Sequence, residues 1–129
     1  KLSERTGFSN SRQVWRVVRQ RVVDSCASVI DIDYLDASLV PQLNRSIAEY
    51  SIYDYIENQL NLSISHAFKE ITIDNATDQD KILIDLGKDQ HVVCVRSKVY
   101  LNNGKQFQFT ESRHKLEKFK FVDYAKRHH

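Results

Sequence analysis

The 129-residue chain has little glycine, cysteine or long apolar sequence, and each shortage excludes a class of protein. Its three glycines are too few for a glycine-rich phosphate loop. Cys26 and Cys94 stand in no metal or redox motif, no spacing of His, Cys, Asp and Glu fits zinc, and two reduced thiols in a cytoplasmic protein are the simplest interpretation. No apolar run reaches the length of a membrane span. We therefore expect no cofactor, no metal and no membrane partner.

The charge balance is also informative, because a formal net charge of +2 is too small to imply nucleic-acid binding by itself. A hydrophobic content of 41% is ordinary for one soluble globular domain. Because the chain starts at Lys1 and not at Met, we expect it to be a piece of a longer protein.

Residues 92–121 contain the most informative stretch, in which two strand-like runs flank Asn102-Asn103-Gly104. Asn-Gly supplies the positive φ angles of a tight hairpin turn. Phe107 and Phe109 share one parity, which predicts an aromatic core face. The other parity is a row of uncharged hydrogen-bonding groups that ends in a histidine: Gln108, Thr110, Ser112 and His114. Such a row fits a pocket for a polyhydroxyl ligand, and a merely polar outer face is the alternative.

A second hairpin is predicted from two runs, residues 13–23 and 28–35. If the connecting loop has an odd number of residues, Asp31 lies opposite or diagonal to Arg19 and Arg21 on one face, and an even loop separates them. One interpretation is a surface ion pair, which contributes less than about 1 kcal/mol. The other is a pair of guanidiniums that converge on a carboxylate or phosphate, held in place by the acid.

The remaining segments predict two helices and further strands. Ser51 is the expected N-cap of a helix over residues 51–60, whose N-terminus could hold an anion. A strand over residues 63–73 is expected to bend between Phe68 and Ile71, where its apolar parity switches. Thr77 and Asp80 form a capping box for a helix over residues 78–86 that ends at Gly87, and an extra strand is expected after the last hairpin. This order predicts an α+β fold with an antiparallel sheet and helices packed to one side.

The sequence contains no evidence for catalysis. Glu111 and His114 are the best acid and base candidates, but three residues apart on a strand they lie on opposite faces. Cys94 has no activating histidine nearby in the sequence, and no serine stands in a nucleophile elbow. We expect no catalytic residue and no enzyme activity.

Three segments together resemble a known family of bacterial regulators. They are SIYDYIENQLNLSI, the helix ending in LIDLGKD, and VVCVRSKVYLNNGKQFQFTESRHKLEKFKF. Their order and spacing are similar to the UTRA effector-binding domain of GntR-type transcription regulators of the HutC subfamily, over about residues 13–122. The resemblance implies a chorismate-lyase-like fold and a UTRA domain over residues 1–129. It also implies an N-terminal winged helix-turn-helix domain that is absent from this chain.

The same resemblance implies a set of ligand-binding residues. Members that bind sugar phosphates have two arginines one residue apart on the first long strand, an acid ten residues further on, and a serine at a helix start. The matching positions here are Arg19, Arg21, Asp31 and Ser51. Gln108 and His114 stand where the family often has Glu and Tyr, which implies a sugar other than an amino sugar.

The implied function is that of the ligand-sensing domain of a cytoplasmic transcriptional repressor. Residues 2–11 and 110–127 are most similar to the branch of the family that represses trehalose operons, which makes trehalose 6-phosphate the expected effector. The expected partners are this sugar phosphate, operator DNA through the missing domain, and a second copy in a homodimer. The alternative is an enzyme of the same fold, a lyase acting on an aromatic carboxylate, because two arginines can also hold a carboxylate.

Overall fold

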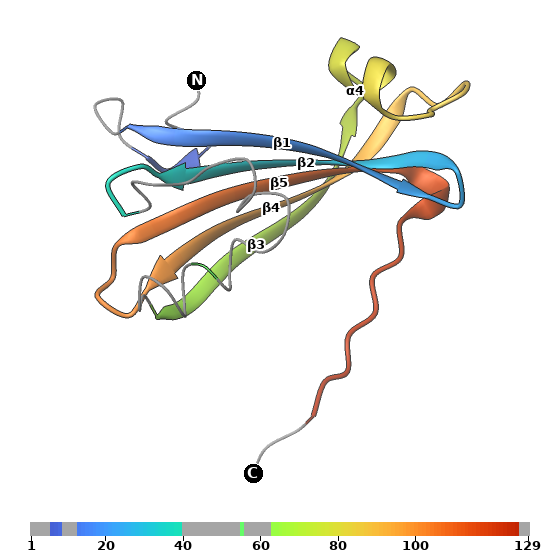
Figure 1. Cartoon of the computed structure of the whole chain (residues 1–129). Coiled ribbons are helices and arrows are strands. Elements are labelled where there is room, and N and C mark those ends of the chain that lie inside the picture. Colours follow the sequence, from blue (N-terminus) through green and yellow to red (C-terminus); the bar gives the residue numbers. More distant parts are fainter. Residues whose placement is uncertain (1–5, 9–12, 40–54, 56–62, 127–129) are drawn as a thin grey trace.

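The computed structural model describes residues 6–8, 13–39, 55 and 63–126, and in them the chain forms one antiparallel sheet. The strands are β1 (Val14–Val23), β2 (Cys26–Asp36), β3 (Ile64–Asn75), β4 (His91–Leu101) and β5 (Gln106–Lys115). They lie in the order β1-β2-β5-β4-β3, so the C-terminal hairpin packs between the N-terminal hairpin and β3 (Figure 1). The predicted antiparallel sheet is confirmed.

A β-bulge in the first hairpin, which the sequence did not predict, brings the charged residues of β1 and β2 to one face. Asp24 and Ser25, with φ angles of 52° and 62°, form a two-residue turn, which is an even loop. By itself this loop would place Asp31 and Arg19 on opposite faces. The register shifts between Arg21 and Val22, however, so that Arg21 pairs with Val29 while Val22 pairs with Ala27. The extra residue in β2 restores the parity, and Arg19 lies directly opposite Asp31.

A second bulge corrects the prediction that Phe107 and Phe109 share one face. Val99 pairs with Gln108, but the next residue of β4, Tyr100, pairs with Gln106. Phe107 is therefore the extra residue of a bulge next to the Asn-Gly turn, and its ring packs in a different cluster from that of Phe109.

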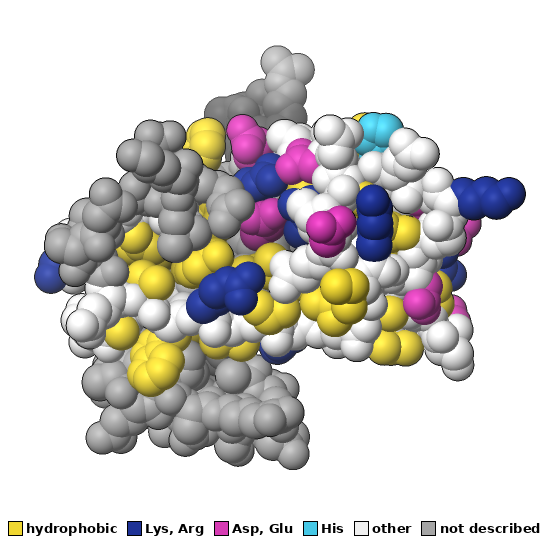
Figure 2. Space-filling model, turned by 90° about the horizontal axis from the view of Figure 1, so that it is seen from above, with side chains coloured by type: hydrophobic (Ala, Val, Ile, Leu, Met, Phe, Trp, Pro, Cys, Tyr) yellow, Lys and Arg dark blue, Asp and Glu magenta, His cyan; other side chains and the backbone are white. Residues whose placement is uncertain are grey.

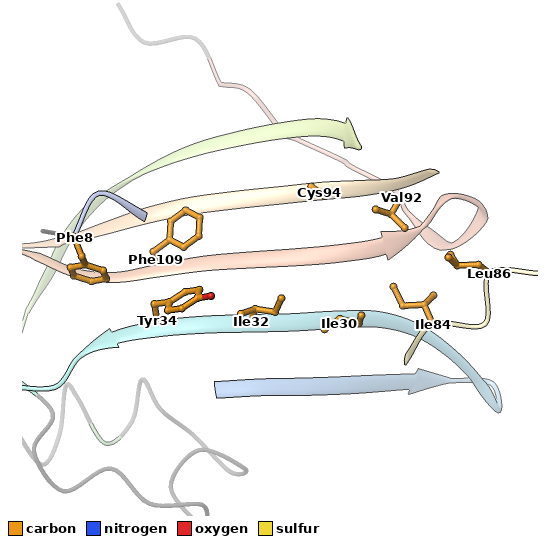
Figure 3. Close-up of a cluster of buried hydrophobic side chains, with 9 residues drawn as sticks. All are labelled: Phe8, Ile30, Ile32, Tyr34, Ile84, Leu86, Val92, Cys94 and Phe109. Carbon is orange, nitrogen blue, oxygen red and sulfur yellow. The ribbon is translucent and has the colours of Figure 1, made fainter. Parts of the chain in front are cut away.

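The core lies on both faces of the sheet. One cluster, drawn in Figure 3, consists of Phe8, Ile30, Ile32, Tyr34, Ile84, Leu86, Val92, Cys94 and Phe109. The other consists of Leu35, Tyr55, Val99, Leu101 and Phe107. Burial of large apolar side chains contributes about 1.5–3 kcal/mol each, so these two clusters hold the sheet and its covering segments together.

Helix α4 (Asp78–Leu83) begins as predicted and ends early. The Thr77 hydroxyl accepts from the N–H of Asp80, and the Asp80 carboxylate accepts from the N–H of Thr77, which confirms the capping box. The helix ends at Leu83 and not at Leu86, because Ile84 is already extended and its side chain enters the core. Gly87, with φ +62°, lies in the turn that follows.

Three further predictions have different outcomes. No extra strand follows β5 in the described residues: the 3-10 turn η2 (Leu116–Lys118) comes next, and residues 119–126 have no regular structure. The irregularity of β3 falls between Ile64 and His66, not between Phe68 and Ile71, whose pairing with β4 is continuous. The helix expected over residues 51–60 lies outside the described residues except for Tyr55.

The finer description of the fold stays a prediction. Helix α4 lies over the face of the first cluster, whereas Tyr55 packs in the second, so helices to one side only are not confirmed. A chorismate-lyase-like arrangement is likewise untested. In the part of the chain that the structure describes, no helix has the length and apolar character needed to cross a membrane.

Candidate functional site

Two arginine–aspartate pairs lie side by side on β1 and β2. Arg21 contacts Asp31 through two nitrogens, with Nε 2.7 Å from one carboxylate oxygen and Nη2 3.1 Å from the other. Arg19 donates from Nη2 to Asp33, at 3.0 Å. The arginine side chains remain 53% and 41% exposed, so each guanidinium is held at one edge and open to solvent elsewhere. Held in this way, they can offer oriented donors to an anion.

The polar row of β5 lies against these acids. Strand β5 pairs with β2 so that Ser112 is opposite Asp31, and the Ser112 hydroxyl donates to Asp31 at 2.7 Å. Gln108, which is buried, donates from Nε2 to Asp33 at 3.2 Å. Two residues of this polar row, Gln108 and Ser112, therefore donate hydrogen bonds to the same carboxylates that hold the arginines. The row is not merely a polar outer face.

His114 closes the row at the other end of β5. It pairs with Val29 on β2 and Val93 on β4. Its ring packs against the ring of Phe119 in a T-shaped arrangement, with 5.1 Å between the ring centroids. Burial lowers the pKa of His114, and the positive charge of Arg21 lowers it further, whereas Asp31 opposes both. The imidazole is consequently held in its neutral form and can both donate and accept a hydrogen bond near neutral pH.

The structure thus brings most of the predicted ligand residues to one face of the sheet. Arg19, Arg21, Asp31, Gln108 and His114 share this face by strand register. Ser51 lies outside the described residues. The cross-strand ion pair that was one interpretation of these arginines is present, and it extends into two hydrogen-bonded sets, Arg19–Asp33–Gln108 and Arg21–Asp31–Ser112. Binding of an anion by the arginines stays a prediction.

Sequence reasoning missed Asp33 as a member of this site. It is Asp33 and not Asp31 that holds Arg19, and its side chain is only 5% exposed. Burial raises the pKa of Asp33, and the charge and hydrogen bond of Arg19 offset this only in part. The sequence did contain one indication, because Asp33 has the same parity as Asp31 on β2 and so lies on the same face. Its diagonal contact with Arg19, however, depends on the register that the bulge sets between β1 and β2.

The opposite face carries a separate, mostly buried ion network. Arg113 donates two hydrogen bonds to Asp80, from Nε at 2.7 Å and from Nη2 at 2.8 Å, and a third to Glu111 at 2.6 Å. This network ties α4 to β5. It confirms that Glu111 and His114 lie on opposite faces and cannot act together on one substrate.

The other chemistry-bearing groups give no second site. Both cysteines are free, as predicted, and burial raises the pKa of Cys94 to about 12, which keeps its thiol protonated. Among the described residues, no group of three or more His, Cys, Asp or Glu could hold a metal ion.

Charges of both signs also mix on the face of the molecule that is seen from above. Viewed from above, Lys and Arg side chains lie directly beside Asp and Glu side chains, next to a band of hydrophobic side chains (Figure 2). With a net charge of +2, no strong field of one sign attracts anions, so anion binding depends on local orientation of donors.

Comparison with known proteins identifies the family. The UTRA domain family matches residues 1–120. The HTH-type transcriptional regulator TreR of Bacillus subtilis is 48% identical over 114 residues, which cover 88% of this chain and 48% of the relative. The transcriptional repressor NagR of the same species is 26% identical over 121 residues, covering 94% of this chain and 50% of NagR. The chain spans about half the length of these curated relatives.

Solved structures of related domains have the same fold. The effector-binding domain of the B. subtilis trehalose repressor TreR superposes with a TM-score of 0.90 at 43% identity, covering 99% of this chain and 89% of that one. A GntR-family regulator from Bacillus cereus, at 24% identity, shares the fold with a TM-score of 0.87 over 96% of this chain and 87% of its own. The chain therefore belongs to the UTRA domain family, and it is an effector-binding domain related to that of a transcriptional regulator, not an enzyme.

Proposed function

We propose that this domain senses a phosphorylated sugar, with trehalose 6-phosphate as the effector. The observation that carries the proposal is the pair of half-exposed arginines, each fixed by a buried or partly buried carboxylate, beside the amide, hydroxyl and imidazole groups of β5. The similarity to a protein named trehalose repressor selects the sugar.

The two halves of the site suit the two halves of this ligand. A phosphate dianion that leaves water needs charged donors, and each charge-assisted hydrogen bond contributes about 1.5–3 kcal/mol. Arg19 and Arg21 supply them, and the family resemblance implies Ser51, which lies outside the described residues, as a further contact. Gln108 and His114 present donors and acceptors to the sugar hydroxyls, and Asp31 accepts from them or holds Arg21.

We further propose that the complete protein is a cytoplasmic repressor that contacts operator DNA through a domain outside this chain. Effector binding changes its DNA affinity only if the effector binds the two states of the protein with different free energies. The relatives that support this proposal are named as transcriptional regulators or repressors.

The direct test is calorimetric titration of the domain with trehalose 6-phosphate, trehalose and glucose 6-phosphate. We expect trehalose 6-phosphate to bind at least about a hundredfold more tightly than trehalose, because two or more charge-assisted hydrogen bonds are lost without the phosphate. Glucose 6-phosphate should bind at an intermediate level, because it retains the anion and lacks one ring. Equal binding of trehalose and its phosphate would rule out the anion site.

We also propose that the domain forms a twofold homodimer through the edge strand β3. This strand carries three exposed large apolar side chains, Phe68, Ile71 and Ile73, at 67%, 45% and 70% exposure. A long, apolar edge strand promotes pairing with another chain, and closed twofold dimers are the commonest assembly.

Sedimentation of the domain and of Ile73→Lys tests this surface. We expect the unmodified domain to sediment as a dimer at tens of micromolar and Ile73→Lys to shift it toward monomer, because a charge replaces apolar contact area. Ile82→Lys is the control, since Ile82 is also exposed, at 79%, but belongs to α4 and not to the edge strand. A monomer at high micromolar concentration, or equal loss in both variants, would contradict the assignment.

A further inference from the structure

Asp33 stands between the two halves of the proposed effector site and contacts both. One carboxylate oxygen, Oδ2, accepts from Arg19 at 3.0 Å, and the other, Oδ1, accepts from Gln108 at 3.2 Å. The carboxylate is nearly out of reach of solvent, whereas the guanidinium that it holds is 41% exposed. Asp33 is therefore placed to orient other groups rather than to meet a ligand from solvent.

We propose that Asp33 is a positioning residue: the buried Gln108 donates to one of its carboxylate oxygens, and the other oxygen holds the exposed guanidinium of Arg19 in the orientation that an anion meets. The inference rests on the proposed function of this face. The Arg19 side chain is long and loses rotamer freedom when it binds, which costs about 0.5–1.5 kcal/mol for a side chain that the ligand must immobilise. A buried carboxylate that already holds it removes part of this cost before the ligand arrives.

The electrostatics of Asp33 indicate that the fold does not need its charge. Burial raises its pKa, the charge of Arg19 opposes this, and Asp31 nearby adds to the rise. A carboxyl group whose pKa is higher in the folded than in the unfolded chain is, when ionised, less favourable in the folded state. At neutral pH the ionised carboxylate of Asp33 is therefore less favourable in the fold than its protonated form would be.

Asp74 provides the contrasting case on the opposite face. It also binds an arginine, Arg96, and accepts from the Thr72 hydroxyl at 2.7 Å. Burial works to raise the pKa of Asp74, but the hydrogen bonds from Arg96 and Thr72 outweigh it and lower the pKa to about 2. Its charge stabilises the fold above pH 3.8, and this contribution is lost as the pH falls toward about 2.

A different role for Asp33 would have the opposite consequence. If its carboxylate only neutralised Arg19, it would compete with a bound phosphate for the same guanidinium. Replacing it by the neutral amide would then free Arg19 and tighten binding of an anion. Positioning and competition thus predict changes of affinity in opposite directions.

The experiment compares Asp33→Asn with Asp74→Asn by thermal unfolding and by titration with trehalose 6-phosphate. We expect Asp33→Asn to lose less thermal stability than Asp74→Asn, because the charge of Asp33 is unfavourable in the fold and that of Asp74 is favourable, and to bind the ligand at least about tenfold more weakly. Asp74→Asn should unfold at a lower temperature at pH 7 and bind within about twofold of the unmodified domain. A merely structural role for Asp33 would give both variants the same pattern.

A double-mutant cycle of ligand affinities separates a specific effect of Asp33 on Arg19 from a general loss of folded protein. If Asp33 acts through Arg19, then Arg19→Ala combined with Asp33→Asn should bind within about threefold of Arg19→Ala alone. Affinity of Asp33→Asn within twofold of the unmodified domain, tighter binding, or fully additive losses would overturn the role of Asp33. Failure of the unmodified domain to bind any sugar phosphate would instead overturn the proposed function, and this inference with it.

Discussion

Replacing Arg113 with methionine is expected to lower the free energy of unfolding by about 3–5 kcal/mol. The guanidinium is 8% exposed and binds Asp80, which is fully buried. Methionine fills much of the same volume but leaves the Asp80 carboxylate without its cation, and an uncompensated buried charge is strongly destabilising. The loss is a large part of the 5–15 kcal/mol that is usual for a domain.

The same pair predicts the pH dependence. Burial works to raise the pKa of Asp80, but its hydrogen bonds with Arg113 and Thr77 lower it below 3.8. The stability that Asp80 contributes is therefore present above pH 3.8 and is lost as the pH falls through the lowered pKa. In Arg113→Met this contribution should be reduced at all pH values above that range.

Urea denaturation of both proteins, at pH 7 and at pH 3, measures the effect. Arg16→Met is the control, because Arg16 is an exposed arginine that donates to the Tyr34 hydroxyl at 3.1 Å, and the loss of this one hydrogen bond should cost about 0.5–1.5 kcal/mol. A lower midpoint with an unchanged slope would indicate lost stability rather than altered compactness. If Arg113→Met loses no more stability than Arg16→Met, the buried pair does not hold α4 to the sheet.

Replacing Arg19 or Arg21 with alanine is expected to weaken binding of the sugar phosphate by about ten- to a hundredfold or more each. Each change removes charged donors that are fixed by Asp33 or Asp31 and open to solvent. Lysine in either place should restore only part of the affinity, because it supplies a point charge without the planar fork. Calorimetric titration with trehalose 6-phosphate measures each loss.

Lys69→Ala is the matched control for a lost positive charge. Lys69 is exposed on β3 at the other edge of the sheet, where it pairs with Ser97, and we expect its variant to bind within about twofold of the unmodified domain. Gln108→Ala and His114→Ala should change which sugar is preferred. Full affinity in the arginine variants would show that the anion binds elsewhere.

Short-range features were predictable because they depend on neighbours in the sequence. The Asn-Gly turn before β5 and the capping box of Thr77 and Asp80 follow from the backbone angles and hydrogen bonds that those residue types favour locally. The alternation along β1, β2 and β5 likewise assigned Arg19, Arg21 and Gln108 to strands before any pairing was known. The family resemblance then selected them as ligand residues.

Partners far apart in the sequence were decided only by the tertiary structure. Arg113 and Asp80 are 33 residues apart, and nothing local distinguishes that pair from a solvated arginine and a capping aspartate. Asp33 had the parity of its neighbour Asp31, but its contact with Arg19 depends on how β1 pairs with β2.

The two bulges show the physical reason most directly. A strand alternates faces with a period of two, so one extra residue reverses the face of every residue beyond it. In β2 the extra residue after Ala27 brings Asp31 to the face of Arg19 in spite of an even loop, and in β5 the bulge separates Phe107 from Phe109. The sequence by itself determined the five strands, the Asn-Gly turn and the capping box of Thr77 and Asp80. Which face each strand residue occupies was decided by the pairing of whole strands, because the cost of a bulge is balanced against core burial along their full length.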